Sequence, residues 1–149
     1  TLPTHQIVGM GEAFAIASME LEQDQQRIKA LRERLWRGIS ALDEIKLNGD
    51  PERRVANVLN VGFDYVDGEA LLMALQDIAV STSSACSSAT ITPSHVLLAM
   101  GLSDNLAHSS LRISLGRFTT EAEVDYAIEV ITKGVTRLRN LSPLWEERK

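Results

Sequence analysis

The feature that most constrains the fold of this chain is a helical pattern through its first forty residues or so. Apolar residues recur there at intervals of three, four and seven, the spacing of one helix face. They are Ile7, Met10, Phe14, Ala17, Leu21, Ile28, Leu31, Leu35 and Ile39. The pattern predicts one long helix or two collinear helices, too long to pack on one small core throughout. We therefore expect its first half to dock on another part of the protein.

Two segments further along have the alternation of strands. Val58 to Phe63 lies in a β-branched and aromatic stretch, and apolar residues alternate with polar ones from Leu111 to Leu115. A short buried strand at Ala79-Val80 is the weakest of these assignments. Between 48 and 51 the run Asn-Gly-Asp-Pro is a strong breaker.

Three further helices are predicted. Asp67-Gly68 can cap a helix whose apolar face is Leu71, Leu72, Leu75 and Ile78. Pro93 suits the first turn of a short helix that runs to Met100 and is closed by Gly101. Thr120 and Glu123 form a capping box, and the helix behind it ends near Leu141. Its apolar stripe is Val124, Ile128, Ile131, Val135 and Leu138.

This order of elements predicts an α+β fold, in which helices pack on one face of a small, mainly antiparallel sheet. The 149 residues, 44% of them apolar, suffice for a core without disulfides. The net charge of −5 argues against nucleic-acid binding, which draws on a basic excess. One cysteine excludes an intrachain disulfide, and no apolar run has the length of a membrane span, so a cytoplasmic location is expected.

Cys86 is the first candidate for chemistry. It lies in the segment 81–92, where eight of twelve residues are Ser or Thr and no regular periodicity is visible. We interpret this segment as a mobile loop, because Ser and Thr compete for backbone hydrogen bonds. A thiol on such a loop is exposed and can travel, which suits a nucleophile. The alternative is a small buried hydrophobic residue in a purely structural domain.

Arg112 is the second candidate. Its neighbours Leu111 and Ile113 are apolar, so the strand holds its side chain on the opposite face. A fixed guanidinium is well suited to bind a carboxylate through two hydrogen bonds. The alternative is an ordinary surface arginine. His5, His95 and His108 make no metal-ligand spacing with Cys86, so no metal site is predicted.

Several segments together resemble the IscS/NifS-type cysteine desulfurases. Residues 84–89 read SACSSA and are similar to the SACTSA active-site loop of that family. Residues 108–120 read HSSLRISLGRFTT and match its HSS-hydrophobic-R-hydrophobic-SLGRFTT segment. Leu2-Pro3 with the following HQIVG, the Asn48-Gly49-Asp50 turn and the LSPLWE run at 141–146 agree as well. The resemblance covers essentially the whole chain, in order.

The resemblance implies the C-terminal portion of a fold-type-I, pyridoxal-phosphate-dependent homodimer of the class V aminotransferase type. Such enzymes convert L-cysteine to L-alanine and pass the sulfur on as a persulfide, for iron–sulfur cluster assembly and tRNA thiolation. By position, Cys86 would be the nucleophile that becomes the persulfide, and Arg112 would bind the substrate carboxylate. Thr1 would reach the pyridoxal phosphate of the neighbouring subunit. Scaffold and sulfur-acceptor proteins are the implied partners.

The same resemblance assigns residues 1–20 to the end of the large cofactor domain and the start of the interdomain helix. Residues 21–149 would form the small domain, with the catalytic cysteine on the loop 81–92. The four lysines, Lys29, Lys46, Lys133 and Lys149, lack the Ser-x-His-Lys context of the cofactor lysine, so this chain alone is expected to be inactive. Ser83 replaces the family's usual glycine. The alternative is a free-standing module that accepts or relays persulfide from a separate desulfurase.

Overall fold

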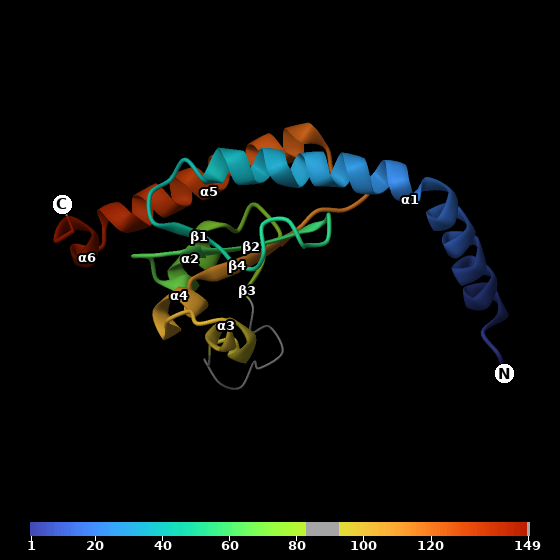
Figure 1. The fold of residues 1–149 in the computed structure, drawn as a ribbon, viewed down its shortest axis with the longest axis horizontal. Coiled ribbons are helices and arrows are strands. Elements are labelled where there is room, and N and C mark those ends of the chain that lie inside the picture. Colours follow the sequence, from blue (N-terminus) through green and yellow to red (C-terminus); the bar gives the residue numbers. More distant parts are fainter. Residues whose placement is uncertain (83–92, 149) are drawn as a thin grey trace.

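The structure is a computed structural model and describes residues 1–82 and 93–148. Helices lie above and below a four-stranded antiparallel sheet (Figure 1). The strands are β1 (Ile45–Leu47), β2 (Val58–Phe63), β3 (Ser81–Thr82) and β4 (Ser110–Ser114). The helices are α1 (Thr4–Ile39), α2 (Gly68–Ala74), α3 (His95–Ala99), α4 (Asp104–His108), α5 (Glu121–Asn140) and α6 (Pro143–Glu146). The predicted α+β class with a mainly antiparallel sheet is confirmed. The prediction that the helices pack on one face is wrong, because α3 and α4 lie on the face opposite to α1 and α5.

Helix α1 is the long helix that the apolar spacing predicts. Only its C-terminal part packs on the sheet, through Leu31, Leu35 and Ile39, each 6% exposed or less. Its N-terminal half projects beyond the sheet (Figure 1). The apolar side chains on that half are largely exposed: Ile7, Val8, Met10, Phe14, Met19 and Leu21. Within the described residues, the first half of α1 therefore lacks the packing partner that its sequence leads one to expect.

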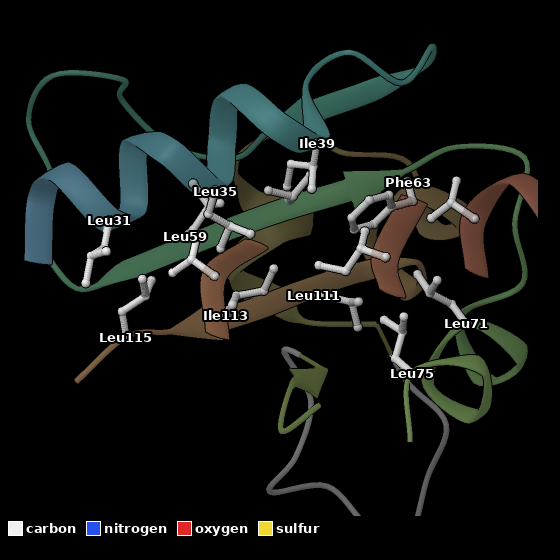
Figure 2. Packing of buried hydrophobic residues seen from close by; sticks show 14 residues of the cluster. Leu31, Leu35, Ile39, Leu59, Phe63, Leu71, Leu75, Leu111, Ile113 and Leu115 are labelled. Atoms are coloured by element: carbon white, nitrogen blue, oxygen red, sulfur yellow. The ribbon is translucent and has the colours of Figure 1, made fainter. Parts of the chain in front are cut away.

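The sheet has the strand order β1-β2-β4-β3, with β2 and β4 in the centre. Strand β2 spans the predicted residues Val58–Phe63, and β4 confirms the alternation around Arg112. Every second residue of both strands points toward α1 and α5, as Leu59, Phe63 and Leu111 do in Figure 2. The hydrophobic core therefore lies between these two helices and one face of the sheet.

Helix α5 begins at the predicted capping box. The Thr120 N–H donates to Glu123 Oε2 at 2.8 Å, and the Glu123 N–H donates to Thr120 Oγ1 at 3.2 Å. Val124, Ile131 and Val135 are buried as predicted, while Ile128 and Leu138 are half-buried at the edge of the core. The helix lies beside α1, and Arg34 of α1 holds Asp125 through two hydrogen bonds of 2.7 and 2.8 Å.

The opposite face of the sheet carries a second, smaller layer. Helices α3 and α4 bury Leu97, Leu102, Leu106 and Ala107 in their own cluster. A Cβ on Gly62 would lie 2.8 Å from Leu106 Cδ1, so glycine allows α4 to approach β2 closely. The prediction that a short helix starts at Pro93 is wrong in detail. Ser94 is the N-cap and α3 starts at His95, while Gly101 does close the turn with φ +86°.

Helix α2 starts at its predicted cap, because Asp67 Oδ1 accepts from the Ala70 N–H at 2.8 Å. Leu71 and Leu75 enter the core, but Leu72 is 39% exposed and is not part of it. The predicted strand at Ala79-Val80 is also wrong. The strand is Ser81–Thr82, because these two residues, and not the preceding pair, bond to β4. Of the predicted loop 81–92, residues 83–92 lie outside the described ranges.

The C-terminal segment is anchored by a buried arginine. Arg139 is 3% exposed and donates to the carbonyls of Asp43, Glu44 and Asp64 at 2.6 to 3.1 Å. Its guanidinium also lies 4.6 Å from the ring centroid of Trp145, which follows α5. Trp145 thus packs on the buried arginine. Across the described ranges, no helix has the length and apolar character required to cross a bilayer.

Candidate functional site

Arg112 is the central residue of the candidate site. It lies in the middle of β4, between Leu111 and Ile113, which are 0% and 6% exposed. These two side chains point into the core, so the Arg112 side chain lies on the other face of the sheet and is exposed there. Among the described residues, no carboxylate lies within ion-pair distance of its guanidinium, and no described acceptor takes a hydrogen bond from it. A central strand thus holds a guanidinium whose donors are available to a ligand.

Arg112 belongs to a row of polar residues that crosses the sheet. Asn60 of β2 lies directly opposite Arg112, and Ser81 of β3 lies opposite it on the other side. Asn48 follows β1 and continues the row, because its N–H donates to the Asn60 carbonyl oxygen at 2.9 Å. We call Asn48, Asn60, Arg112 and Ser81 the polar row. Directly opposed residues in antiparallel strands share a face of the sheet, so these side chains lie on the side away from α1 and α5.

The Asn48 end of the polar row is buried and hydrogen-bonded. Asn48 is 6% exposed and Ser110 is fully buried. Asn48 Nδ2 donates to Asn60 Oδ1 at 2.7 Å and to Ser110 Oγ at 3.1 Å. The Ser110 hydroxyl donates in turn to the Leu106 carbonyl oxygen at 2.7 Å. The network therefore fixes Asn60 from one side, while the Arg112 side remains exposed.

Cys86, the predicted nucleophile, lies outside the described residues, as does Ser83. The structure does describe the strand that leads to them. Strand β3 ends at Thr82, one residue after Ser81 in the polar row. The chain therefore enters the cysteine-containing segment directly beside Arg112.

Thr1 is not brought near Arg112. It is exposed and precedes α1 by three residues, at the end of the helix that projects from the sheet (Figure 1). From Thr4 to Ile28, where packing on the core begins, α1 rises by about 36 Å at 1.5 Å per residue. A site shared by Thr1 and Arg112 of the same chain is excluded by this length.

The described lysines do not form a cofactor site. The ammonium groups of Lys29 and Lys133 lie beside Glu33 and Glu129 on exposed helix surfaces, and Lys46 is exposed on the edge strand β1. A lysine that binds pyridoxal phosphate needs a pocket around the aldehyde and phosphate groups. The described part of the chain does not fit this cofactor by itself. The same part contains no cluster of three His, Cys, Asp or Glu side chains placed to hold a metal ion.

A hollow of about 270 Å³ lies near the far end of β4. It is lined by residues of the α2–β3 connection, β4 and α5, among them Val80, Ser114, Leu115, Glu123 and Tyr126. Among the described carboxylates that line this hollow, Glu123 has a shifted pKa. The Thr120 N–H and hydroxyl lower this pKa by bonding to the ionised form. That carboxylate caps α5, which is a structural role. The hollow does not include Arg112.

The sequence pattern predicts a site role for Arg112 and assigns none to Asn60, Asn48 and Ser110, which the structure places around it. Asn60 does carry a signal, since it is the polar residue in the middle of an otherwise apolar strand. The sequence marks Asn48 only as part of a turn, because its pairing with Asn60 depends on strand β1, which the sequence does not predict.

Comparisons with known proteins agree with the segments described above. The profile of the family described as aminotransferase class-V matches residues 1–127. A protein named cysteine desulfurase IscS from Salmonella schwarzengrund (strain CVM19633) is 60% identical over 149 residues, which is all of this chain and 37% of that protein. One of the same name from Photorhabdus laumondii is 61% identical over 146 residues, 98% of this chain and 36% of that protein.

Two solved structures are similar as well. A NifS-like protein superposes with a TM-score of 0.79 at 32% identity, over 93% of this chain and 35% of the other. The NifS-like protein from Rickettsia africae ESF-5 gives 0.74 at 26% identity, over 86% and 33% of the two chains. The chain thus spans little more than a third of the curated relatives that it matches.

Proposed function

The chain belongs to the aminotransferase class-V family, and from this premise we propose that it is the C-terminal portion of a cysteine desulfurase. The longer protein would convert L-cysteine to L-alanine and carry the sulfur as a persulfide. The support is the 60% identity, along the whole chain, to proteins named cysteine desulfurase IscS. Residues 1–20 would complete the large domain and begin the interdomain helix. Residues 21–149 would form the small domain, which accords with the packing of α1 from Ile28 onward.

Arg112 is the proposed binding residue for the substrate carboxylate. Its guanidinium is exposed, is held by a central strand and makes no ion pair within the described ranges. An arginine of this kind binds a carboxylate through two parallel hydrogen bonds, which fixes the orientation as well as the position of an amino acid. This exposed guanidinium, which a central strand carries and which is unpaired within the described residues, is the single observation that carries the assignment of Arg112.

Cys86 is the proposed sulfur acceptor. In the net reaction the C–S bond of L-cysteine breaks, a sulfur–sulfur bond forms on the Cys86 thiol, and a proton takes the place of sulfur on carbon. Cys86 thiol and L-cysteine thus become Cys86 persulfide and L-alanine, without any external oxidant or reductant. Cys86 is five residues from Ser81, so an extended chain keeps it within about 17 Å of the polar row.

The remaining roles concern the longer protein. Pyridoxal phosphate would be bound by residues outside this chain, since the described lysines do not fit it. Thr1 would serve the cofactor of the neighbouring subunit in a homodimer, in accord with its distance from the Arg112 of its own chain. The sulfur would be passed to scaffold and acceptor proteins for iron–sulfur cluster assembly and tRNA thiolation, in the cytoplasm.

The full-length protein and the 149-residue chain, each with pyridoxal phosphate and L-cysteine, test this proposal. We expect the full-length protein to release alanine and sulfide in equal amounts in the presence of a thiol, and the short chain to release neither. Alanine release by the short chain would contradict the assignment. If the short chain takes up sulfur from a separate desulfurase and no longer form is present in cells, the relay module replaces it.

A further inference from the structure

Asn60 is the member of the polar row that the proposed function leaves unexplained. It lies directly opposite Arg112 across the two central strands. It is half-buried, and its carbonyl oxygen Oδ1 accepts a hydrogen bond from Asn48. Its amide nitrogen Nδ2 donates to no acceptor among the described residues. Two N–H donors are therefore available beside a guanidinium that also lacks a described partner.

The orientation of the Asn60 amide follows from the network behind it. The Ser110 hydroxyl donates its one hydrogen to the Leu106 carbonyl oxygen. Toward Asn48, the Ser110 oxygen therefore acts as an acceptor. The Asn48 atom at 3.1 Å from Ser110 Oγ must then be the nitrogen Nδ2. The same nitrogen lies 2.7 Å from Asn60, which must present its oxygen to it. Asn60 Nδ2 is thereby left on the other side of the amide.

Burial limits the motion of this network, since Asn48 is 6% exposed and Ser110 is fully buried. In this orientation Asn48 Nδ2 has two acceptors, whereas Asn48 Oδ1 is buried and has no partner among the described residues. Within the described residues, the Asn60 amide nitrogen and the Arg112 guanidinium offer N–H donors on one face of the sheet, and an acceptor with two oxygens is a matching ligand.

We infer that Asn60 Nδ2 is a second donor to the carboxylate that Arg112 binds, and that Asn48 and Ser110 are positioning residues for it. This inference rests on the proposed function, in which the carboxylate is that of L-cysteine. A guanidinium alone binds carboxylates of many shapes, whereas an added, fixed amide donor restricts the rotation of the bound group. Asn60 therefore contributes to affinity and orientation for an α-carboxylate.

Substitution N60D in the full-length protein is the first test. The aspartate keeps an oxygen for Asn48, so the network behind it persists, but it places a negative charge opposite Arg112. We expect KM for L-cysteine to rise by about tenfold or more, with kcat changed by less than about threefold. With cysteine methyl ester, which has no carboxylate, the variant and the unaltered protein should differ little. The matched control is N57D, an exposed position in the turn just before β2.

A binding measurement on the unaltered full-length protein keeps the inference independent of folding and of turnover. With asparagine labelled by ¹⁵N, L-alanine should shift the Asn60 side-chain resonances, and L-alaninamide should not. Equal KM values for N60D and N57D, or equal responses to both alanine compounds, would overturn the inference. Absence of sulfide release from L-cysteine by the unaltered protein would instead overturn the proposed function, and the alanine titration would still decide the role of Asn60.

Discussion

Arg112 and Asn60 lie directly opposite each other on the two central strands, with their side chains on the face of the sheet away from α1 and α5. The buried neighbours Leu111 and Ile113 fix the backbone at Arg112. Asn48 holds the Asn60 side chain by donating a hydrogen bond to its amide oxygen. Neither residue of the pair depends on a flexible segment for its position. The backbone positions of both residues are therefore fixed before a ligand arrives, while the exposed Arg112 side chain becomes ordered on binding, which costs side-chain entropy.

Replacement of Arg112 by alanine should weaken substrate binding without harming the fold. A charge-assisted hydrogen bond contributes about 1.5 to 3 kcal/mol, so kcat/KM for L-cysteine should fall by about 10- to 150-fold in the full-length protein. For R112K, kcat/KM should fall less, because lysine keeps the positive charge but loses the bidentate geometry. Thermal stability should stay unchanged, since Arg112 is exposed and unpaired in the described ranges. Unchanged kcat/KM in R112A would exclude it from the site.

The two halves of α1 should differ sharply in their contribution to stability. Leu35 is 1% exposed and fills the core beneath α1 and α5, so L35A in the 149-residue chain should lower the free energy of unfolding by about 2 to 5 kcal/mol. Phe14 on the same helix is 71% exposed, and F14A should change it by less than about 0.5 kcal/mol. Urea unfolding followed by circular dichroism measures both. Similar losses in the two variants would mean that the first half of α1 is packed.

Arg139 should be the most sensitive charged residue for stability. R139M removes the guanidinium, so the carbonyl oxygens of Asp43, Glu44 and Asp64 lose their hydrogen bonds from it. The contact with Trp145 is lost as well. We expect a loss of about 2 to 3 kcal/mol in the free energy of unfolding. R137M, two residues before Arg139 on the exposed side of α5, is the matched control and should be nearly neutral. Equal effects of the two substitutions would show that the anchor contributes little.

Acid should destabilise the fold through three carboxyls. The Thr120 N–H lowers the pKa of Glu123, the Arg34 guanidinium that of Asp125, and the Arg53 N–H that of Asp50. A carboxyl whose pKa is lowered by folding stabilises the protein at pH values above its ordinary pKa, which is 4.5 for Glu and 3.8 for Asp. This stabilisation is lost as the pH falls through the lower pKa of the folded state. The urea concentration at the unfolding midpoint should therefore decrease once the pH is below about 4.5.

The capping-box glutamate provides the control for this pH dependence. E123Q removes one of the three titrating groups, so its urea midpoint should fall less steeply with acid than that of the unaltered chain. T120A removes the cap itself and should cost about 1 kcal/mol at neutral pH. An acid response in E123Q identical to that of the unaltered chain would show that Glu123 does not contribute.

The fold could be predicted where local chemistry decides it and not where tertiary pairing does. Strand β2 and the cap of α5 follow from alternation and from the Thr120–Glu123 spacing. Strand β3 could not be predicted, because Ser81 and Thr82 have no apolar alternation and are strand only through pairing with β4. Strand β1, at three residues, and α4, at five, are too short to show a period.

The site shows the same division. The rigidity of Arg112 follows from its apolar neighbours in the sequence, and the structure places it on the open face of the sheet as expected. Asn60 and Asn48 are twelve residues apart, and only the register of β1, β2 and β4 brings them into line with Arg112. Register is set by which faces are buried and by turn geometry, which residue spacing alone does not reveal.

The mass of the peptide that contains Cys86 is the most direct test of the proposed function. The full-length protein would be incubated with pyridoxal phosphate and a low concentration of L-cysteine, then digested without a reducing agent. The account predicts that this peptide gains one sulfur atom in the unaltered protein, gains much less in R112A, and that the corresponding peptide gains none in C86S. A peptide of unchanged mass in the unaltered protein, while alanine is being released, would contradict the assignment of Cys86 as the sulfur acceptor.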